Sequence, residues 1–160
     1  MFRKIVLTAA LIAPVGAFAQ ELPTAPYLPL ELAAKAADAA VKACAEKGHA
    51  VAVAVVARDG ATKVLLKADR SGPHTGSSAT GKAFTSAAMG RPSGDLAKFI
   101  SENPANDGLR DMDSRFVIQG GGLPVKFGDA LVAGIGVGGA PSGDIDAECA
   151  AAGLAAIGAK

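Results

Sequence analysis

The chain has 160 residues, of which 50% are hydrophobic, and its formal net charge at pH 7 is +1. This near-neutral balance excludes the strongly basic surface that nucleic-acid binding requires. The sequence has no Trp and a single Tyr, so it also lacks an aromatic platform on which bases could stack. The length suits one domain, and we expect it to bind a small molecule or another protein.

The first 19 residues have the anatomy of a secretory signal peptide. Arg3 and Lys4 precede an apolar run over residues 5–15, and Ala17-Phe18-Ala19 fits a small-x-small cleavage site. The apolar run is short for a membrane span. We therefore expect cleavage after residue 19, leaving 160 − 19 = 141 residues with a charge of about −1, in the periplasm or secreted, and with no membrane contact after cleavage.

The first half of the mature chain predicts a leader, a helix and a hairpin. Residues 20–29 contain three prolines and predict an extended leader. Apolar residues recur at helical spacing over residues 30–47, and Gly48 is a typical residue to end such a helix. Residues 50–57 alternate Val and Ala, which is typical of a strand buried on both faces, and a turn at 58–60 leads to a strand over 62–67.

The second half predicts further helices around three short strands. We expect helices over residues 77–89, 94–102 (capped by Ser93) and 145–157, a loop at 106–108, and strands over 115–118, 124–127 and 130–137. There is no repeated βαβ unit. The fold class is therefore α/β of the α+β kind, a single domain over residues 30–160 in which helices flank a central antiparallel sheet of about five strands.

Three motifs have both a structural and a functional interpretation. Residues 134–139 match G-x-G-x-x-G, but the chain is too short for the second parallel strand of a dinucleotide site, so we favour a packing role. The Gly120-Gly121-Gly122 run could cradle an anion with its backbone N–H groups or form a tight turn. The acids at 144, 146 and 148 could ligate a metal, although complementing a helix dipole is the simpler role.

The two cysteines also leave two alternatives open. Cys44 and Cys149 each fall in a predicted helix, one near each end of the chain. In an exported protein they could form a disulfide that ties the two helices together. They could equally be small buried hydrophobic residues in Ala-rich helix faces.

The stretch from Asp69 to Met89 contains the strongest candidate for chemistry. His74 follows a Gly-Pro turn, and Thr75, Ser77 and Ser78 stand where helix N-caps are expected. The imidazole could be a metal ligand, a general base or merely a turn residue. Zinc would need three or four ligands, whereas haem needs only one axial imidazole, because the porphyrin supplies the other four nitrogens. Arg70, Lys82 or Arg91 could then pair with the haem propionates.

Several motifs in order resemble the haem-binding HbpS/GlcG family, which also occurs as the C-terminal module of PduO-type cobalamin proteins. They are VAVAVVARDG at 51–60, GPHT at 72–75, GKAFTSA at 81–87, GGGLP at 120–124 and VAGIGVGG at 132–139, followed by Asp144, Asp146, Glu148 and Cys149. The resemblance spans about 28–157 and implies an antiparallel sheet flanked by helices, a homo-oligomer, and haem or, less favoured, corrinoid as the cofactor.

From the residues and the resemblance together we expect an exported haem-binding protein that stores, transfers or degrades haem. His74 is the expected iron ligand, and the expected cofactor-binding residues are Arg70, Thr75, Lys82, Arg91, Gly120, Gly121 and Gly122. The alternatives are an enzyme or binding module for a small anionic metabolite or corrinoid, and a sensory accessory protein that acts through a protein partner. The sequence assigns no catalytic residue.

Overall fold

The computed structural model describes residues 21–160, so the predicted signal peptide lies outside the described residues. Residues 21–29 form neither helix nor strand, and Leu28 is the one buried side chain among them. The elements that follow are listed here by their bounds: α1 (Leu30–Glu46), β1 (Ala52–Ala57), β2 (Thr62–Lys67), α2 (Thr75–Met89), α3 (Ser93–Glu102), the 3-10 helix η1 (Pro104–Asp111), β3 (Gly122–Phe127), β4 (Ala130–Gly138) and α4 (Gly143–Ala156).

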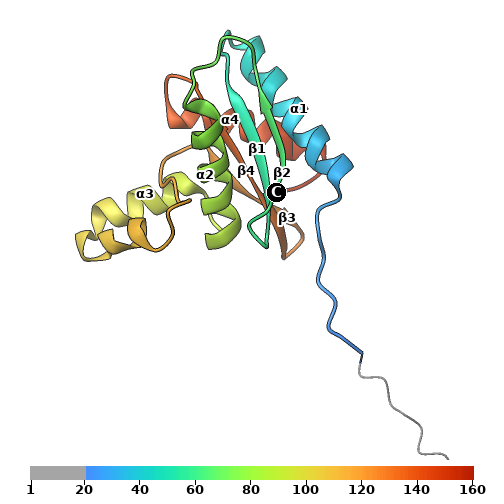
Figure 1. Cartoon of the computed structure of the whole chain (residues 1–160), viewed down its shortest axis with the longest axis vertical. Helices are drawn as coiled ribbons and strands as arrows, with labels where there is room; N and C mark the ends of the chain where they lie inside the picture. The colour runs from blue at the N-terminus through green and yellow to red at the C-terminus, as the bar shows by residue number, and fades with distance from the viewer. Residues whose placement is uncertain (1–20) are drawn as a thin grey trace, which may run out of the picture.

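Four strands form one antiparallel sheet in the order β2-β1-β4-β3 (Figure 1). The predicted α+β class, with helices around an antiparallel sheet, is confirmed. Helices α1 and α4 cover one face of the sheet and α2 covers the other, while α3 and η1 extend from the side opposite α1 (Figure 1). Helix α1 ends as its sequence predicts, because Gly48 follows it with a φ of +81°.

Strand β1 divides its side chains between two cores, as the twofold period of a strand requires. Val53 and Val55 face α1 and α4 in the larger core, whereas Ala52, Ala54 and Val56 face α2 in the smaller one. All five side chains have no exposed surface. The prediction of a strand buried on both faces is therefore confirmed, and the alanines on the α2 side let that helix lie close to the sheet.

The G-x-G-x-x-G motif of residues 134–139 packs a helix against the sheet. A Cβ on Gly134 would overlap the carbonyl oxygen of Ala83, and one on Gly136 would overlap that of Ala79. Both glycines lie on β4, and both carbonyls belong to α2. The absence of side chains at these two positions sets the distance between the helix and the strand, so the packing interpretation of the motif is confirmed.

The predicted strand over residues 115–118 is wrong, and the sheet formed by the described residues has four strands where about five were expected. This segment hydrogen-bonds to a helix instead of to a strand. The backbone N–H of Val117 donates to the hydroxyl of Thr85 on α2 at 3.0 Å, and that hydroxyl donates to the carbonyl of Gly81 at 2.8 Å. Strand pairing begins only at Gly122, where β3 starts.

Two further predictions, one of a helix cap and one of a loop, also differ from the structure. Ser93 is not an N-cap, since Pro92 has that position. The Ser93 hydroxyl donates to the carbonyl of Gln119 at 2.5 Å and accepts from the N–H of Gly122 at 2.9 Å, so it joins α3 to β3. The predicted loop at 106–108 is part of η1.

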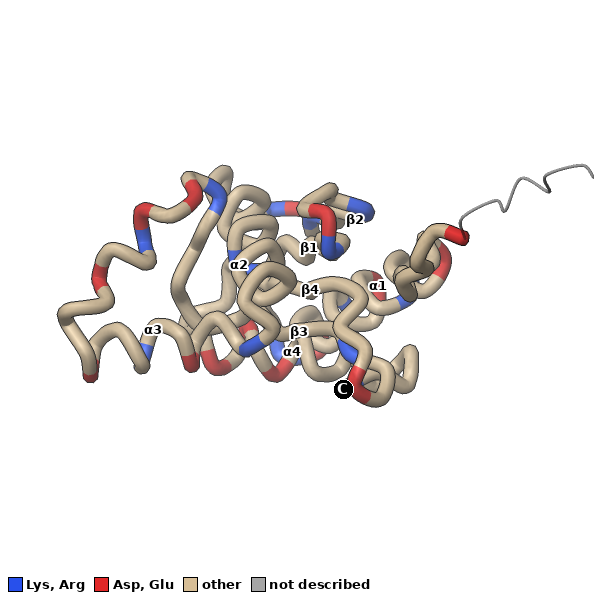
Figure 2. The backbone as a smooth tube through the Cα atoms, turned by 90° about the horizontal axis from the view of Figure 1, so that it is seen from below, with Lys and Arg blue, Asp and Glu red and all other residues tan. Residues whose placement is uncertain are grey.

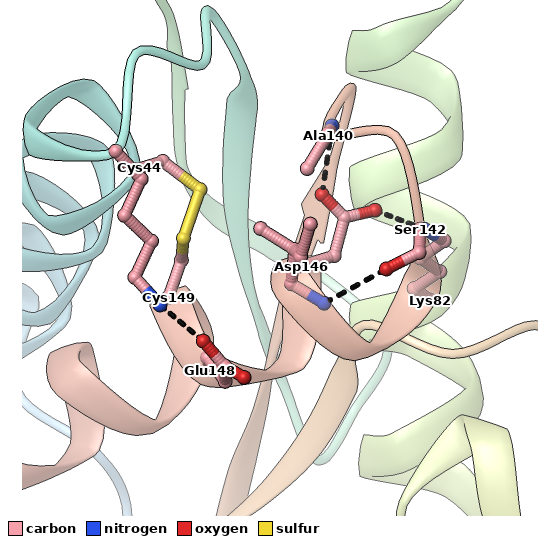
Figure 3. Close-up of a disulfide and its surroundings, with 9 residues drawn as sticks. Cys44, Lys82, Ala140, Ser142, Asp146, Glu148 and Cys149 are labelled. Carbon is pink, nitrogen blue, oxygen red and sulfur yellow. Dashed lines mark hydrogen bonds and ion pairs between the residues drawn. A yellow bond between two sulfur atoms is a disulfide. The ribbon is translucent and has the colours of Figure 1, made fainter.

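A disulfide between Cys44 and Cys149 joins α1 to α4, with 5.5 Å between their Cα atoms (Figure 3). Both residues are fully buried, and beside them Lys47 and Glu148 form an ion pair. The disulfide resolves the two alternatives that the sequence left open. At the other end of the fold, Lys160 exchanges backbone hydrogen bonds of 2.8 and 2.9 Å with Lys126 and so covers the outer edge of β3.

Charged residues of both signs are interspersed along residues 21–160, and Figure 2 shows no region of a single sign. Within this part of the chain, no helix has both the length and the apolar character needed to cross a membrane.

Candidate ligand-binding site

His74 lies on a turn that is fixed by hydrogen bonds from its neighbours. It is the N-cap residue of α2, and no side chain caps this helix; Thr75, Ser77 and Ser78, expected to be caps, lie inside the helix. Thr75 is buried, and its hydroxyl donates to the carbonyl of Gly72 at 2.8 Å and lies 3.2 Å from the hydroxyl of Ser71. Thr75 therefore holds the turn together.

The imidazole of His74 is exposed at the surface of this turn. Its ring packs against Gly72, where a Cβ would come within 2.9 Å of Cε1. Within residues 21–160, no side chain or backbone group forms a hydrogen bond or an ion pair with this imidazole. An exposed imidazole without a protein partner is available as a donor to a metal or to a ligand.

A pocket of about 620 Å³ opens beside His74. Its walls are the hairpin of β1 and β2, the first three turns of α2 and the segment 114–117. The volume lies within the range of roughly 300–1,000 Å³ that is typical of small-molecule sites. The lining residues are mostly apolar or small: Val56, Gly60, Thr62, Leu65, His74, Gly76, Ser77, Ser78, Thr80, Gly81, Phe84, Ser114, Arg115 and Val117.

Arg115 forms part of the pocket wall and was not among the residues that the sequence indicated. Its guanidinium lies 3.9 Å from the ring centroid of Phe84, and the ring of Phe116 is 5.5 Å from that of Phe84. Asp113 accepts from Arg115 Nε at 2.9 Å and from Nη2 at 2.7 Å. The hydrogen bond from the Arg115 side chain lowers the pKa of Asp113 to about 2 and raises that of Arg115.

A signal for this pair exists in the sequence, although it is weak. Asp113 and Arg115 are two residues apart just after η1, and an Asp side chain commonly hydrogen-bonds to the backbone two residues further on. The N–H of Arg115 does donate to Asp113 Oδ1 at 2.9 Å. The turn was not predicted, because residues 115–118 were expected to form a strand.

A smaller, polar pocket of about 220 Å³ lies on the other side of His74. It contains Lys82, whose ammonium is buried and donates to Asp146 Oδ2 at 2.7 Å (Figure 3). Asp146 Oδ1 also accepts from the N–H of Ala140 at 3.1 Å. Lys82 and Asp146 therefore form a buried ion pair between α2 and α4, and the Lys82 charge is matched within the protein. Neither residue lines the larger pocket.

The other residues that the sequence indicated lie away from the larger pocket. Gly120, Gly121 and Gly122 line a third pocket, of about 500 Å³, together with residues of α3 and α4. Arg91 is exposed and stacks on Phe99 of α3 with 5.6 Å between its guanidinium carbon and the ring centroid. Arg70 is exposed in the turn before α2 with a φ of +65°. Of the expected set, the larger pocket thus includes His74 alone.

Ionisable side chains do not converge into a metal cluster in the described part of the chain. Among residues 21–160, no group of three or more His, Cys, Asp or Glu is placed to hold a metal ion. The expected alternative of Asp144, Asp146 and Glu148 as metal oxygens has no support here, since Asp146 pairs with Lys82 and Glu148 with Lys47.

Comparisons with known proteins identify relatives over nearly the whole described chain. The family model described as "Haem degrading protein HbpS-like" matches residues 28–155. A crystal structure of HbpS is 45% identical, with a TM-score of 0.80 over 88% of this chain and 97% of that one. A double mutant of HbpS from Streptomyces reticuli is also 45% identical, with a TM-score of 0.80 over 91% of this chain and 97% of that one.

A more distant structure shares the fold. The PduOC:Heme complex is 24% identical, with a TM-score of 0.78 over 84% of this chain and 98% of that one. A search of the curated proteins gives no match.

Proposed function

This chain belongs to the HbpS-like family, and from that membership we propose that it is a haem-binding protein whose site is the pocket of about 620 Å³ beside His74. The observation that carries this proposal is the exposed His74 imidazole, which has no protein partner within residues 21–160 and stands at the rim of a mostly apolar pocket. The relative described as a haem complex adds support through its shared fold.

The residues of the pocket fit a haem in size and in chemistry. Val56, Leu65, Phe84 and Val117 provide an apolar surface for a flat macrocycle. His74 provides an imidazole nitrogen, and one axial imidazole is sufficient for haem iron. A bound haem would supply an iron centre with redox and oxygen chemistry.

The chain's own residues perform three tasks in this proposal. The Thr75 and Ser71 hydroxyls fix the turn on which His74 stands. Phe84 and Val117 exclude water from one side of the pocket. The segment 114–117 is tied to α2 through Thr85, so the wall that it forms is anchored to the helix that follows His74.

We test the proposal by titrating the purified mature protein with haem and following the Soret band. The wild type should saturate, and His74→Ala should lose or shift the saturated band, because its iron lacks the imidazole. The matched control is His49→Ala, which removes the second histidine of the chain, a residue outside the pocket lining. If His74→Ala gives the same band and affinity as the control, His74 is not the ligand.

We also propose that the protein acts outside the cytoplasm, in the periplasm or secreted. The sequence of residues 1–19 has the anatomy of a cleaved signal peptide. The buried disulfide between Cys44 and Cys149 supports this location, because disulfides persist in oxidising compartments and are rare in the cytosol.

A further inference from the structure

We propose that Arg115 recognises the carboxylate groups of the ligand and makes the pocket selective for an apolar, planar molecule with an acidic edge. This inference rests on the proposed haem binding, since haem has two propionate groups. It differs from the expectation drawn from the sequence, in which Arg70, Lys82 or Arg91 had this role.

The lining of the pocket contains one cationic side chain. Among the residues that line it, Arg115 is the one Lys or Arg, and none is Asp or Glu. Lys82 is buried and matched by Asp146, while Arg70 and Arg91 lie outside the lining. Arg58, at the neighbouring hairpin turn, donates to the carbonyl of Ala87 on α2. A carboxylate in the pocket would therefore find its cationic partner in Arg115.

The Arg115 guanidinium is held in place before any ligand binds. One face lies 3.9 Å from the Phe84 ring centroid. On the hairpin side, Nη1 would come within 2.9 Å of a Cβ on Gly60, so the lack of a side chain at Gly60 makes room for it. Asp113 holds Nε and Nη2. A cation fixed in this way loses little conformational freedom when it binds a carboxylate.

Arg115 still has donors to offer after its pairing with Asp113. A guanidinium has five N–H groups, and Asp113 accepts from two of them. For the remaining three, the described residues provide no acceptor. The side chain retains 56% of its exposure, so a ligand at the pocket mouth can reach these groups. Asp113 is in this arrangement a positioning residue, and Arg115 is the residue that contacts the ligand.

The test compares haem with its dimethyl ester, in which both propionates are uncharged. Each ligand is titrated into wild type, Arg115→Met, Arg115→Lys and the control Arg110→Met. Arg110 suits as a control because it is also an exposed Arg paired with an Asp, Asp107 at 2.9 Å, and it lies outside the pocket lining. Melting temperatures of all four proteins establish that the variants fold.

We expect wild type and Arg110→Met to bind haem with a dissociation constant about three- to tenfold lower than that of the ester. This difference suits a charge-assisted contact at a half-exposed site. Arg115→Met should bind the two ligands equally, with its Soret position unchanged because His74 is intact. Arg115→Lys should retain part of the preference. A folded Arg115→Met that still prefers haem as wild type does would overturn the inference. Failure of wild type to bind either ligand would instead overturn the proposed function.

Discussion

At the scale of single residues, two side chains of the pocket wall, His74 and Arg115, differ in how firmly they are held. His74 has no hydrogen-bond partner within residues 21–160, so its nitrogen is free to coordinate a metal. Arg115, by contrast, is held by Asp113 and stacked on Phe84. A free donor at one side of an apolar pocket and a fixed cation at another match a ligand with a metal centre and an acidic edge.

The Asp113–Arg115 pair gives a pH-dependent prediction. The pKa of Asp113 is lowered from 3.8 to about 2, mainly by the hydrogen bond from Arg115. Since the folded-state pKa lies below the unfolded one, the contribution of this pair to stability is complete above pH 3.8 and is lost as the pH falls through about 2. NMR titration of the Asp113 carboxyl carbon should give a midpoint near 2.

The matched variant for this titration is Arg115→Met. Without the guanidinium, the pKa of Asp113 should rise toward its ordinary value of 3.8. A wild-type midpoint that already lies at the ordinary value would mean that Arg115 is not held by Asp113 in solution, and the proposed fixed cation would be lost.

At the scale of elements, the sequence predicted what depends on local pattern, and it missed or left open what depends on distant pairing. Helical periodicity identified α1, and the Val-Ala alternation identified the doubly buried β1. The Lys82–Asp146 pair joins residues 64 apart in the chain, and the disulfide joins residues 105 apart. No local signal predicts such contacts, because they depend on how α2 and α4 pack against the sheet.

The candidate site also divides into residues with a local sequence signal, which were predicted, and residues brought in by distant contacts, which were not. His74 was found because its Gly-Pro turn and the helix after it are local features. The opposite wall was missed because residues 115–118 have the apolar content of a strand, while their backbone bonds to the Thr85 hydroxyl of α2. The glycines at 120–122 were expected at the same pocket and lie at another, together with residues of α3 and α4.

The close approach of α2 to β4 gives a prediction for stability. Gly136→Ala would place a Cβ against the Ala79 carbonyl of α2, and the helix would have to move away from the strand. We expect a loss of about 1–3 kcal/mol of unfolding free energy, as is typical of overpacking. Urea denaturation of the wild type and of Gly136→Ala measures this difference in unfolding free energy.

Gly108→Ala is the control for this substitution. Gly108 also has ordinary φ, and a Cβ there would meet nothing within 4 Å. Equal unfolding free energies for the two variants would show that α2 and β4 are not in the close contact described.

At the scale of the whole molecule, the disulfide joins the terminal helices to each other and the larger core joins them to the sheet. Helices α1 and α4 share one face with the larger core, and their disulfide closes a loop with a sequence separation of 105 residues. Crosslinks of such long loops restrict the unfolded chain and stabilise the folded state by about 2–5 kcal/mol.

This crosslink gives one prediction for stability and location together. A Cys44→Ala, Cys149→Ala double variant should lose about 2–5 kcal/mol of unfolding free energy.

Protein recovered from the periplasm or medium should have the mass of residues 20–160, lighter by two hydrogens than the reduced chain. Recovery of the full-length, reduced chain from the cytosol would contradict the proposed export.

The measurement that tests the central proposal most directly is the haem titration of the mature wild-type protein beside His74→Ala. We expect a saturable Soret change in the wild type, with the band lost or shifted in His74→Ala and unaffected in His49→Ala. A wild type that gives no saturable change would contradict haem binding by this member of the family. Identical saturated spectra for wild type and His74→Ala would contradict the proposed iron ligand.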